Sequence, residues 1–299
     1  MTMPRGPYRQ ARLRGLCGPT SPAWLLALFL FVCPAAQAKD MLPACPAPKG
    51  AAESPPLARV GVPNLDAASS TRAFQQLIVI GFMGGSVRAN DLVHREALMA
   101  DDLQQRYPLR LHAAVFANRD SRAALETVLH LLDKDKNGCL NAGERNAARI
   151  VIYGHSWGAS ETIALARRLN ELSIPVLLTV QVDSVQKFNE HDGLIPPNVR
   201  QAINFYQSDG FLHGRSRIQA MDPNQTTILG NFESAYKENP VACDRYPWYA
   251  RAFMKQHIEI ENDPSVWNKI EALIQAELPQ SEPPVGAIGQ TTDQLANSH

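Results

Sequence analysis

A serine between two glycines is the clearest candidate for a reactive group in this chain. Gly154, Ser156 and Gly158 form a Gly-x-Ser-x-Gly pattern, which follows the β-branched run Arg149–Tyr153 and precedes the helical run Ala159–Leu172. A serine at such a strand-to-helix corner sits on a strained turn, and the glycines leave room for that turn to pack. Its hydroxyl then lies at a helix N-terminus, whose dipole favours developing negative charge. We therefore predict that Ser156 is a nucleophile; the alternative is an ordinary serine in a turn.

Residues 133–144 form a second pattern with a distinct chemistry. This stretch matches the twelve-residue calcium-binding loop of an EF-hand, with Gly138 at its sharp turn. The predicted ligands are Asp133, Asp135, Asn137, Cys139 through its carbonyl, and Glu144 through both carboxylate oxygens. No second loop of this kind is present in the sequence, and the exit helix must be short because a strand is expected to begin at 149. We predict a structural calcium site; a polar turn without metal is the alternative.

Apolar runs between polar stretches predict the elements that must position these groups. Continuous runs typical of buried parallel strands occur at 77–80, 112–116, 149–153, 175–182, 202–206 and 226–229. Helical spacing joins Leu125 to Leu132, and continues in the segment after Ser156. Asp263 and Pro264 are a favourable start for a further helix that carries Trp267 and Ile274. Alternating strands and helices predict an α/β fold, a doubly wound, mostly parallel sheet flanked by helices.

Over roughly residues 75–278 the sequence resembles the α/β-hydrolase superfamily of lipases and esterases. The resemblance is carried by Gly154-His155-Ser156-Trp157-Gly158 and by a strand that is expected to end in Gly81, within Gly81-Phe82-Met83-Gly84-Gly85. It implies that the backbone amides of Phe82 and Trp157 form the oxyanion hole. Two fixed donors are worth several kcal/mol to the charge that develops on a carbonyl oxygen.

A serine hydroxyl needs a base, and the family places a histidine after the last strand and before a closing helix. His257 has that position, directly upstream of the helix expected at Asp263, and His213 is the second candidate.

The family also requires an acid at the end of a strand beside that of the nucleophile. Asp183 ends the apolar run 176–182, and Asp209 follows Tyr206 by three residues. We favour Asp183, because its place directly at the strand end restricts its backbone; Asp209 stays open.

The N-terminus has the order of a secretory signal peptide. Four arginines without an acid precede an apolar run from Ala23 to Val32, and Ala36-Gln37-Ala38 follows. The apolar run is too short to cross a bilayer as a helix. We predict cleavage after Ala38 (residues 1–38), a Pro/Ala-rich leader (39–72), one hydrolase domain (73–278) and a disordered tail (279–299), in a secreted or periplasmic protein. Lipidation at Cys33 is a weaker alternative, because Val32 is large for such a cleavage site.

Charge and cysteine content limit the possible partners. Processing after Ala38 leaves 25 basic and 29 acidic residues, a net charge of −4, which argues against a nucleic-acid partner. Cys45, Cys139 and Cys243 would remain, enough for one disulfide whose pairing the sequence does not determine. We expect an esterase or lipase-like enzyme without a large lid, acting on a small-molecule or lipid ester. The alternatives are a thioesterase, a peptidase, or a calcium-binding module without catalysis.

Overall fold

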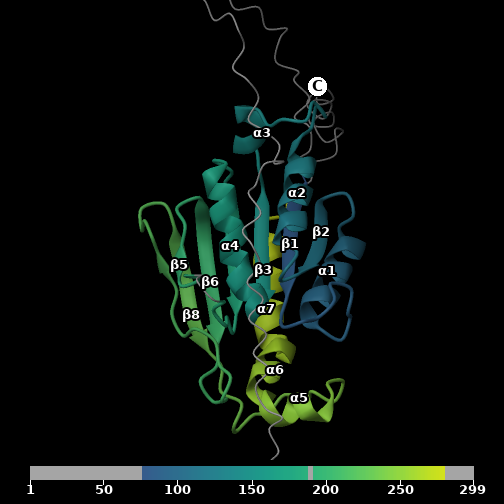
Figure 1. The fold of residues 1–299 in the computed structure, drawn as a ribbon, viewed down its shortest axis with the longest axis vertical. Coiled ribbons are helices and arrows are strands. Elements are labelled where there is room, and N and C mark those ends of the chain that lie inside the picture. Colours follow the sequence, from purple (N-terminus) through teal and green to yellow (C-terminus); the bar gives the residue numbers. More distant parts are fainter. Residues whose placement is uncertain (1–75, 188–190, 280–299) are drawn as a thin grey trace, which may run out of the picture. The chain divides into compact units, whose positions relative to one another are not determined.

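The computed structural model describes residues 76–187 and 191–279, which form a six-stranded sheet flanked by helices (Figure 1). The signal peptide, the leader and nearly all of the tail lie outside these residues. In spatial order the strands are β2 (Leu111–Ala117), β1 (Leu77–Met83), β3 (Ile150–His155), β4 (Val176–Val182), β6 (Val199–Tyr206) and β8 (Thr227–Glu233). Every neighbouring pair is parallel. The predicted fold class is therefore confirmed.

The strand order reverses direction between β1 and β3. The chain goes outward from β1 to β2, returns to place β3 on the other side of β1, and then proceeds through β4 and β6 to β8. Connections leave the sheet in opposite directions at such a switch point, and in open α/β sheets ligands usually bind beyond the carboxyl ends of the two strands. Met83 ends β1 and His155 ends β3, so the predicted nucleophile follows the strand at this point.

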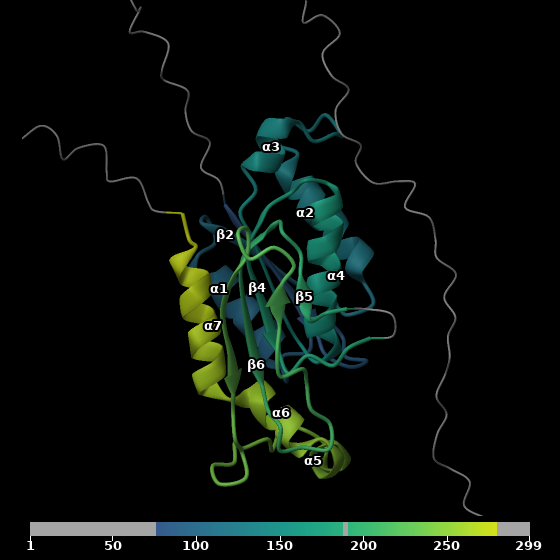
Figure 2. The ribbon, with the colours of Figure 1, turned by 90° about the vertical axis from the view of Figure 1, so that its left-hand side faces the viewer.

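Helices cover both faces of the sheet because successive β1 residues point to opposite sides. Ile78 and Ile80 pack in one apolar cluster with α2 (Ser121–Leu132) and α4 (Trp157–Glu171). Leu77 and Val79 pack in a second cluster with α1 (Arg95–Arg106) and α7 (Pro264–Ala276). Figure 2 shows α7 on one side of the sheet and α4 on the other. All seven residues of β1 are buried, which explains its uninterrupted apolar run.

Several short elements were not predicted from the sequence. They are α5 (Trp248–Phe253), α6 (Lys255–Asn262) and the small two-stranded sheet of β5 (Leu194–Ile195) and β7 (Gln219–Ala220), whereas α3 (Ala142–Asn146) is the short exit helix expected after residue 144. The helix α1 was not predicted either. Of the connection between β4 and β6, the described residues contain only β5, so they include no lid domain. Within the described ranges, none of the helices has the length and apolar character needed to cross a membrane.

The turn from β3 into α4 requires two glycines. A Cβ atom at Gly158 would lie 2.2 Å from the Phe82 carbonyl oxygen, and one at Gly154 would lie 2.5 Å from the Gly158 backbone. Both distances are far below van der Waals contact, and the obstructing atoms belong to the backbone. The first turn of α4 can therefore pack against the end of β1 only if these positions lack side chains.

We predict that Gly158→Ala lowers the free energy of unfolding by about 1–3 kcal/mol or more, because the added methyl group forces the backbones of α4 and β1 apart. Urea denaturation followed by circular dichroism measures the change. Arg168→Ala, at an exposed position of the same helix, is the control and should change stability by no more than about 0.5 kcal/mol. Equal stability of Gly158→Ala and the wild type would contradict the close approach.

Candidate active site

Ser156 occupies a strained turn directly before α4. Its backbone has φ 57° and ψ −123°, a combination that residues with side chains rarely adopt. Its amide donates to the Val182 carbonyl at 2.9 Å, and its carbonyl accepts from the Val185 amide at 3.2 Å. These two bonds fix the serine against the end of β4. The residue is 7 % exposed, at the carboxyl edge of the sheet.

Asp183 and His257 are joined by a short hydrogen bond. The Nδ1 atom of His257 lies 2.6 Å from Oδ2 of Asp183, and both residues are buried. Burial would raise the pKa of Asp183, but the hydrogen bond and charge of His257, together with the hydrogen bond from Gln207, outweigh it and hold the pKa below its ordinary value. The carboxylate is therefore ionised at neutral pH, and Nδ1 of the ring carries the proton that it donates. The other nitrogen, Nε2, remains to exchange a proton.

Further hydrogen bonds hold the Asp183 carboxylate in place. The Gly214 amide donates to Oδ1 at 2.7 Å, and the Gln207 side-chain amide donates to Oδ2 at 2.8 Å. The Gln207 backbone amide is 3.3 Å from Oδ1. Asp183 itself has φ 43°, and a Cβ at Gly214 would lie 2.1 Å from the Asp183 backbone, so Gly214 must be a glycine here.

The imidazole of His257 lies beside the nucleophile turn. His257 comes from α6, and its ring centroid is 4.4 Å from that of His155, the residue that precedes Ser156. Its partner Asp183 directly follows Val182, which accepts the Ser156 amide. No hydrogen bond of the Ser156 hydroxyl to His257 is present among the described residues. In structures without a substrate, the hydrogen bond between a catalytic serine and its base is often long or poorly aligned.

The two alternative candidates lie elsewhere. The carboxylate of Asp209 accepts from the Tyr236 amide at 2.9 Å and pairs with Lys237 at 3.0 Å, so its contacts lie with the segment after β8. His213 is exposed in the loop between β6 and β7. The structure thus brings Asp183 and His257 together, and it places Asp209 and His213 in other contacts.

The two predicted oxyanion donors have different settings. Trp157 is the first residue of α4, so its amide has no partner in the preceding turn, and its side chain is 43 % exposed. Phe82 lies inside β1, because the strand extends to Met83 and does not end at Gly81 as predicted. Phe82 and Met83 remain paired with Phe116 and Ala117 of β2, which explains the longer strand.

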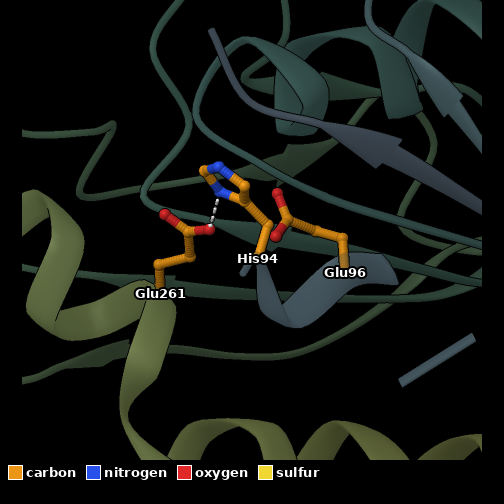
Figure 3. Close-up of side chains that lie close together, drawn as sticks. All are labelled: His94, Glu96 and Glu261. Carbon is orange, nitrogen blue, oxygen red and sulfur yellow. Dashed lines mark hydrogen bonds and ion pairs between the residues drawn. The ribbon is translucent and has the colours of Figure 1, made fainter. Parts of the chain in front are cut away.

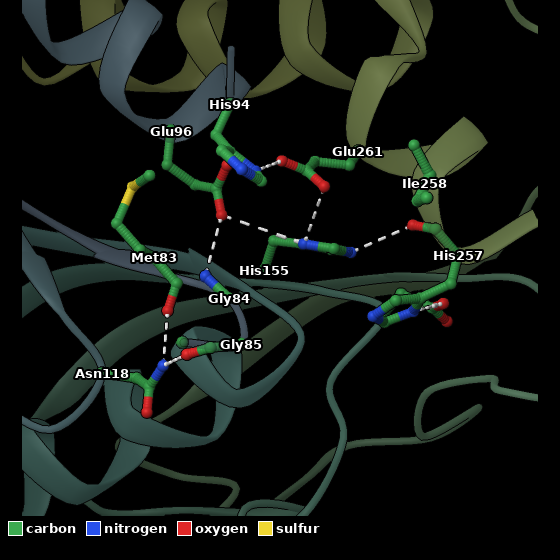
Figure 4. Close-up of polar contacts among 12 residues, drawn as sticks. Met83, Gly84, Gly85, His94, Glu96, Asn118, His155, His257, Ile258 and Glu261 are labelled. Atoms are coloured by element: carbon green, nitrogen blue, oxygen red, sulfur yellow. Dashed lines mark hydrogen bonds and ion pairs between the residues drawn. The ribbon is translucent and has the colours of Figure 1, made fainter. Parts of the chain in front are cut away.

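Two side chains hold the loop beyond β1. The amide of Gly84 donates to Oε1 of Glu96 at 3.2 Å. The Asn118 side chain donates to the carbonyls of Met83, at 3.1 Å, and Gly85 (Figure 4). This loop faces the nucleophile turn, since a Cβ at Gly84 would lie 3.2 Å from the Cβ atom of Ser156.

A buried polar network lies behind the nucleophile turn. His155 Nδ1 is 3.4 Å from Glu261 and 3.8 Å from Glu96, while His94 Nδ1 is 2.5 Å from Glu261 (Figure 4). Burial lowers the pKa of His155 to about 4, so this ring is neutral at pH 7. Burial and the charge of Glu261 raise the pKa of Glu96 well above its ordinary value. Burial would raise the pKa of Glu261 too, but the rings of His155 and His94 outweigh it and lower that pKa.

The sequence did not indicate this network. Glu96 lies on the unpredicted helix α1 and Glu261 on the unpredicted helix α6, and nothing in the spacing of His94 links it to either. Gln207 and Gly214, which hold Asp183, were also missed. They lie in loops after β6, and nothing in their spacing links them to residue 183.

The predicted calcium loop lies at the end of the sheet opposite to Ser156, where Figure 1 shows α3 far from α5 and α6. Carboxylate oxygens of Asp133, Asp135 and Glu144 come within 4.8 Å of one another. Asp133 accepts from the amides of Asn137 and Gly138, each at 3.1 Å, and Gly138 has φ 80°. The short exit helix that we predicted is α3. The oxygen donors and the glycine turn therefore fit the requirements of a calcium ion.

The two cysteines among the described residues differ in state. Cys139, inside the predicted calcium loop, is disulfide-bonded, and its carbonyl stays available as a ligand. Cys243 is a free, half-buried thiol whose pKa is raised to about 11 by burial. Of the pairings that the sequence left open, the two that involve Cys243 are therefore excluded, and Cys45 lies outside the described residues.

No family model matches the chain, and no curated protein matches it. Among solved structures, it is similar to RedJ with a polyethylene glycol molecule bound in the active site, at a TM-score of 0.36 and 12 % identity over 77 % of this chain and 98 % of that one. A hormone-sensitive lipase from a metagenome library gives 0.30 and 14 %, over 67 % and 78 %. A dienelactone hydrolase-like promiscuous phosphotriesterase, P91, from metagenomic libraries gives 0.30 and 12 %, over 70 % and 90 %.

We predict that Asp183→Ala lowers the free energy of unfolding by about 3–5 kcal/mol, because it leaves the buried donors of His257, Gln207 and Gly214 without an acceptor. Asp209→Ala is the matched control: its contacts are nearer the surface, and the expected loss is about 1–2 kcal/mol. Chemical denaturation of both variants measures the difference. Equal losses would contradict the central place of Asp183.

Proposed function

We propose that the protein is a serine hydrolase that cleaves carboxylic esters through an acyl-enzyme on Ser156. The observation that carries this proposal is the 2.6 Å hydrogen bond between buried Asp183 and His257, next to a serine with φ 57°. An acid that holds an imidazole, which in turn lies beside a serine, performs nucleophilic catalysis on several unrelated folds.

Each group has a defined part in the proposed reaction. The Ser156 hydroxyl attacks the ester carbonyl carbon while Nε2 of His257 accepts its proton. Asp183 keeps Nδ1 protonated and stabilises the charge on the ring. The tetrahedral intermediate collapses, and the alcohol leaves with the proton from His257. Water then attacks the acyl-enzyme carbonyl while His257 accepts a proton from it. The carboxylic acid leaves as the Ser156 oxygen takes that proton back.

Backbone amides stabilise the negative oxygen of the tetrahedral intermediate. The Trp157 amide is well suited because it begins α4, where the helix dipole also favours negative charge. The second donor would come from the segment between Phe82 and Gly85, which faces the same turn. The family resemblance implies the amide of Phe82, a residue that is fully buried in β1. The amide of Gly84 is already engaged, because it donates to Glu96.

Exposed aromatic side chains near this edge support an apolar ester substrate. Trp248, Tyr249 and Phe253 of α5 are 57–75 % exposed, and α5 packs against α6, which carries His257. Trp157 adds a half-exposed apolar surface beside the nucleophile. Thioesters and peptides would react with the same three groups, so the class of leaving group is the open part of the proposal. The signal peptide favours a secreted or periplasmic enzyme.

A structural calcium ion belongs to the same proposal. Asp133, Asp135, Asn137, Glu144 and the carbonyl of Cys139 would hold it, and its double positive charge would offset most of the charge of the three carboxylates in the loop before β3. The loop is at the far end of β3 from Ser156, so the ion would stiffen the domain without touching the substrate.

We predict that a fluorophosphonate probe labels the wild-type protein and that Ser156→Ala abolishes labelling, because only an activated serine reacts. Ser208→Ala, which removes an exposed hydroxyl near Asp209, should label as the wild type does. Gel fluorescence measures labelling, and a series of p-nitrophenyl esters then ranks acyl lengths. Folded wild-type protein without labelling would favour a calcium-binding module without catalysis.

Calcium should raise the Tm of the wild-type protein relative to protein in chelator, because the ion binds only the folded loop. The combined change Asp133→Ala and Glu144→Ala should remove this difference. Differential scanning fluorimetry with magnesium as the control ion measures the shift. An identical Tm of the wild type with calcium and with chelator would refute the calcium site.

A further inference from the structure

Four side chains behind Ser156 converge in a way that hydrolysis does not require. One ligand atom each from His94, Glu96 and Glu261 lies within 4.8 Å of the others. The two glutamates are buried and His94 is nearly so, and Figure 3 shows both carboxylates directed toward the His94 ring. His155 approaches the same group from the end of β3.

The hydrogen bonding of His155 determines where its proton lies. Its Nε2 is 3.1 Å from the carbonyl oxygen of His257, and a carbonyl can only accept, so Nε2 must carry the hydrogen. Nδ1 is then the ring nitrogen that is turned toward the glutamates. It lies 3.4 Å from Glu261 and 3.8 Å from Glu96. One ring nitrogen and two carboxyl groups thus face one another in a site shielded from water.

Glu96 provides an independent sign that a ligand belongs here. Its Oε1 accepts from the Gly84 amide, but no N–H or O–H of the other described side chains and backbone donates to its buried Oε2, and the carboxylate of Glu261 lies beside it. A buried carboxylate oxygen without a donor costs about 1–3 kcal/mol or more. The cost disappears if a cation binds between the facing groups.

The geometry points to a divalent transition-metal site, of the zinc class, formed by His94, Glu96, His155 and Glu261. Two imidazole nitrogens and two carboxylate oxygens are a donor set that suits four-coordinate zinc. Ligands about 2.0–2.1 Å from a tetrahedral ion are about 3.3 Å apart, close to the separations of His155 from the two carboxylates. His94 and Glu261, at 2.5 Å, need to separate by about 1 Å.

The outer contacts of His155 and Glu96 are also those of a metal site. Metal-binding histidines almost always donate their second ring nitrogen to a carbonyl or carboxylate, as His155 does to His257. Glu96 is held by the Gly84 amide. The ion would join the loop beyond β1, the start of α1, the nucleophile turn and α6. It would act as a structural tie behind the site and would not contact substrate.

Zinc content of the full chain tests this inference independently of hydrolysis. We expect one zinc ion per chain after incubation with zinc and dialysis, measured by elemental mass spectrometry. Glu96→Gln and His94→Ala should weaken zinc binding at least tenfold. The pair Asp133→Ala and Glu144→Ala, which removes the carboxylates of the calcium loop, is the matched control and should retain the zinc.

Cobalt substitution tests the wild-type site even where a variant fails to fold. Cobalt in a tetrahedral site gives strong visible absorption, and this band should appear in the wild type and disappear on addition of zinc. Folded wild type that binds neither ion would overturn the inference and indicate that Glu96 and Glu261 share a proton. Zinc lost with the calcium-loop variant but kept with Glu96→Gln would overturn it as well. Because neither readout involves activity, a failed labelling experiment at Ser156 would leave this result unaffected.

Discussion

The Asp183 carboxylate accepts hydrogen bonds from a helix and from the connection after β6, and the arrangement of the site depends on them. His257 reaches it from α6, and Gln207 and Gly214 reach it from the connection between β6 and β7. Because the carboxylate is buried, each of these bonds is made where water cannot replace it. One side chain thus fixes the position of the imidazole and of this connection relative to β4.

The sheet topology explains why these groups meet at this edge. The strand order reverses between β1 and β3, and the loop beyond β1 and the turn after β3 face each other at that point. Parallel strands present all their carboxyl ends on one side, so Asp183 at the end of β4 lies at the same edge of the sheet as these two segments. The helix α6, which lies at that edge in Figure 1, completes the site with His257 and Glu261.

The sequence predicted the buried strands and the nucleophile turn because their signals are local. A strand such as β1, buried at every residue, needs an uninterrupted apolar run, and a turn as tight as that at Ser156 needs glycines on both sides. The calcium loop was identifiable for the same reason, since all its ligands fall within twelve residues.

The remaining parts of the site depend on contacts between distant segments. Asp183 and Asp209 both follow strands, and only the fold shows that one of them meets His257, 74 residues away. Glu96 and Glu261 lie on helices that the sequence did not indicate, and both are buried. The extension of β1 past Gly81 results from pairing with β2, which a single strand sequence does not reveal.

Ser156 and Asp183 share one further property, a positive φ at a residue that is not glycine. Each such residue costs on the order of 1–3 kcal/mol, which the surrounding packing must offset. Glycine at position 156 would relieve that strain while removing the hydroxyl that we propose reacts. At Asp183 the buried hydrogen bonds that would be lost outweigh the relief. Selection for thermal stability alone would therefore erode Ser156, which the proposed reaction must keep, and laboratory evolution of a more stable protein should screen for activity in every round.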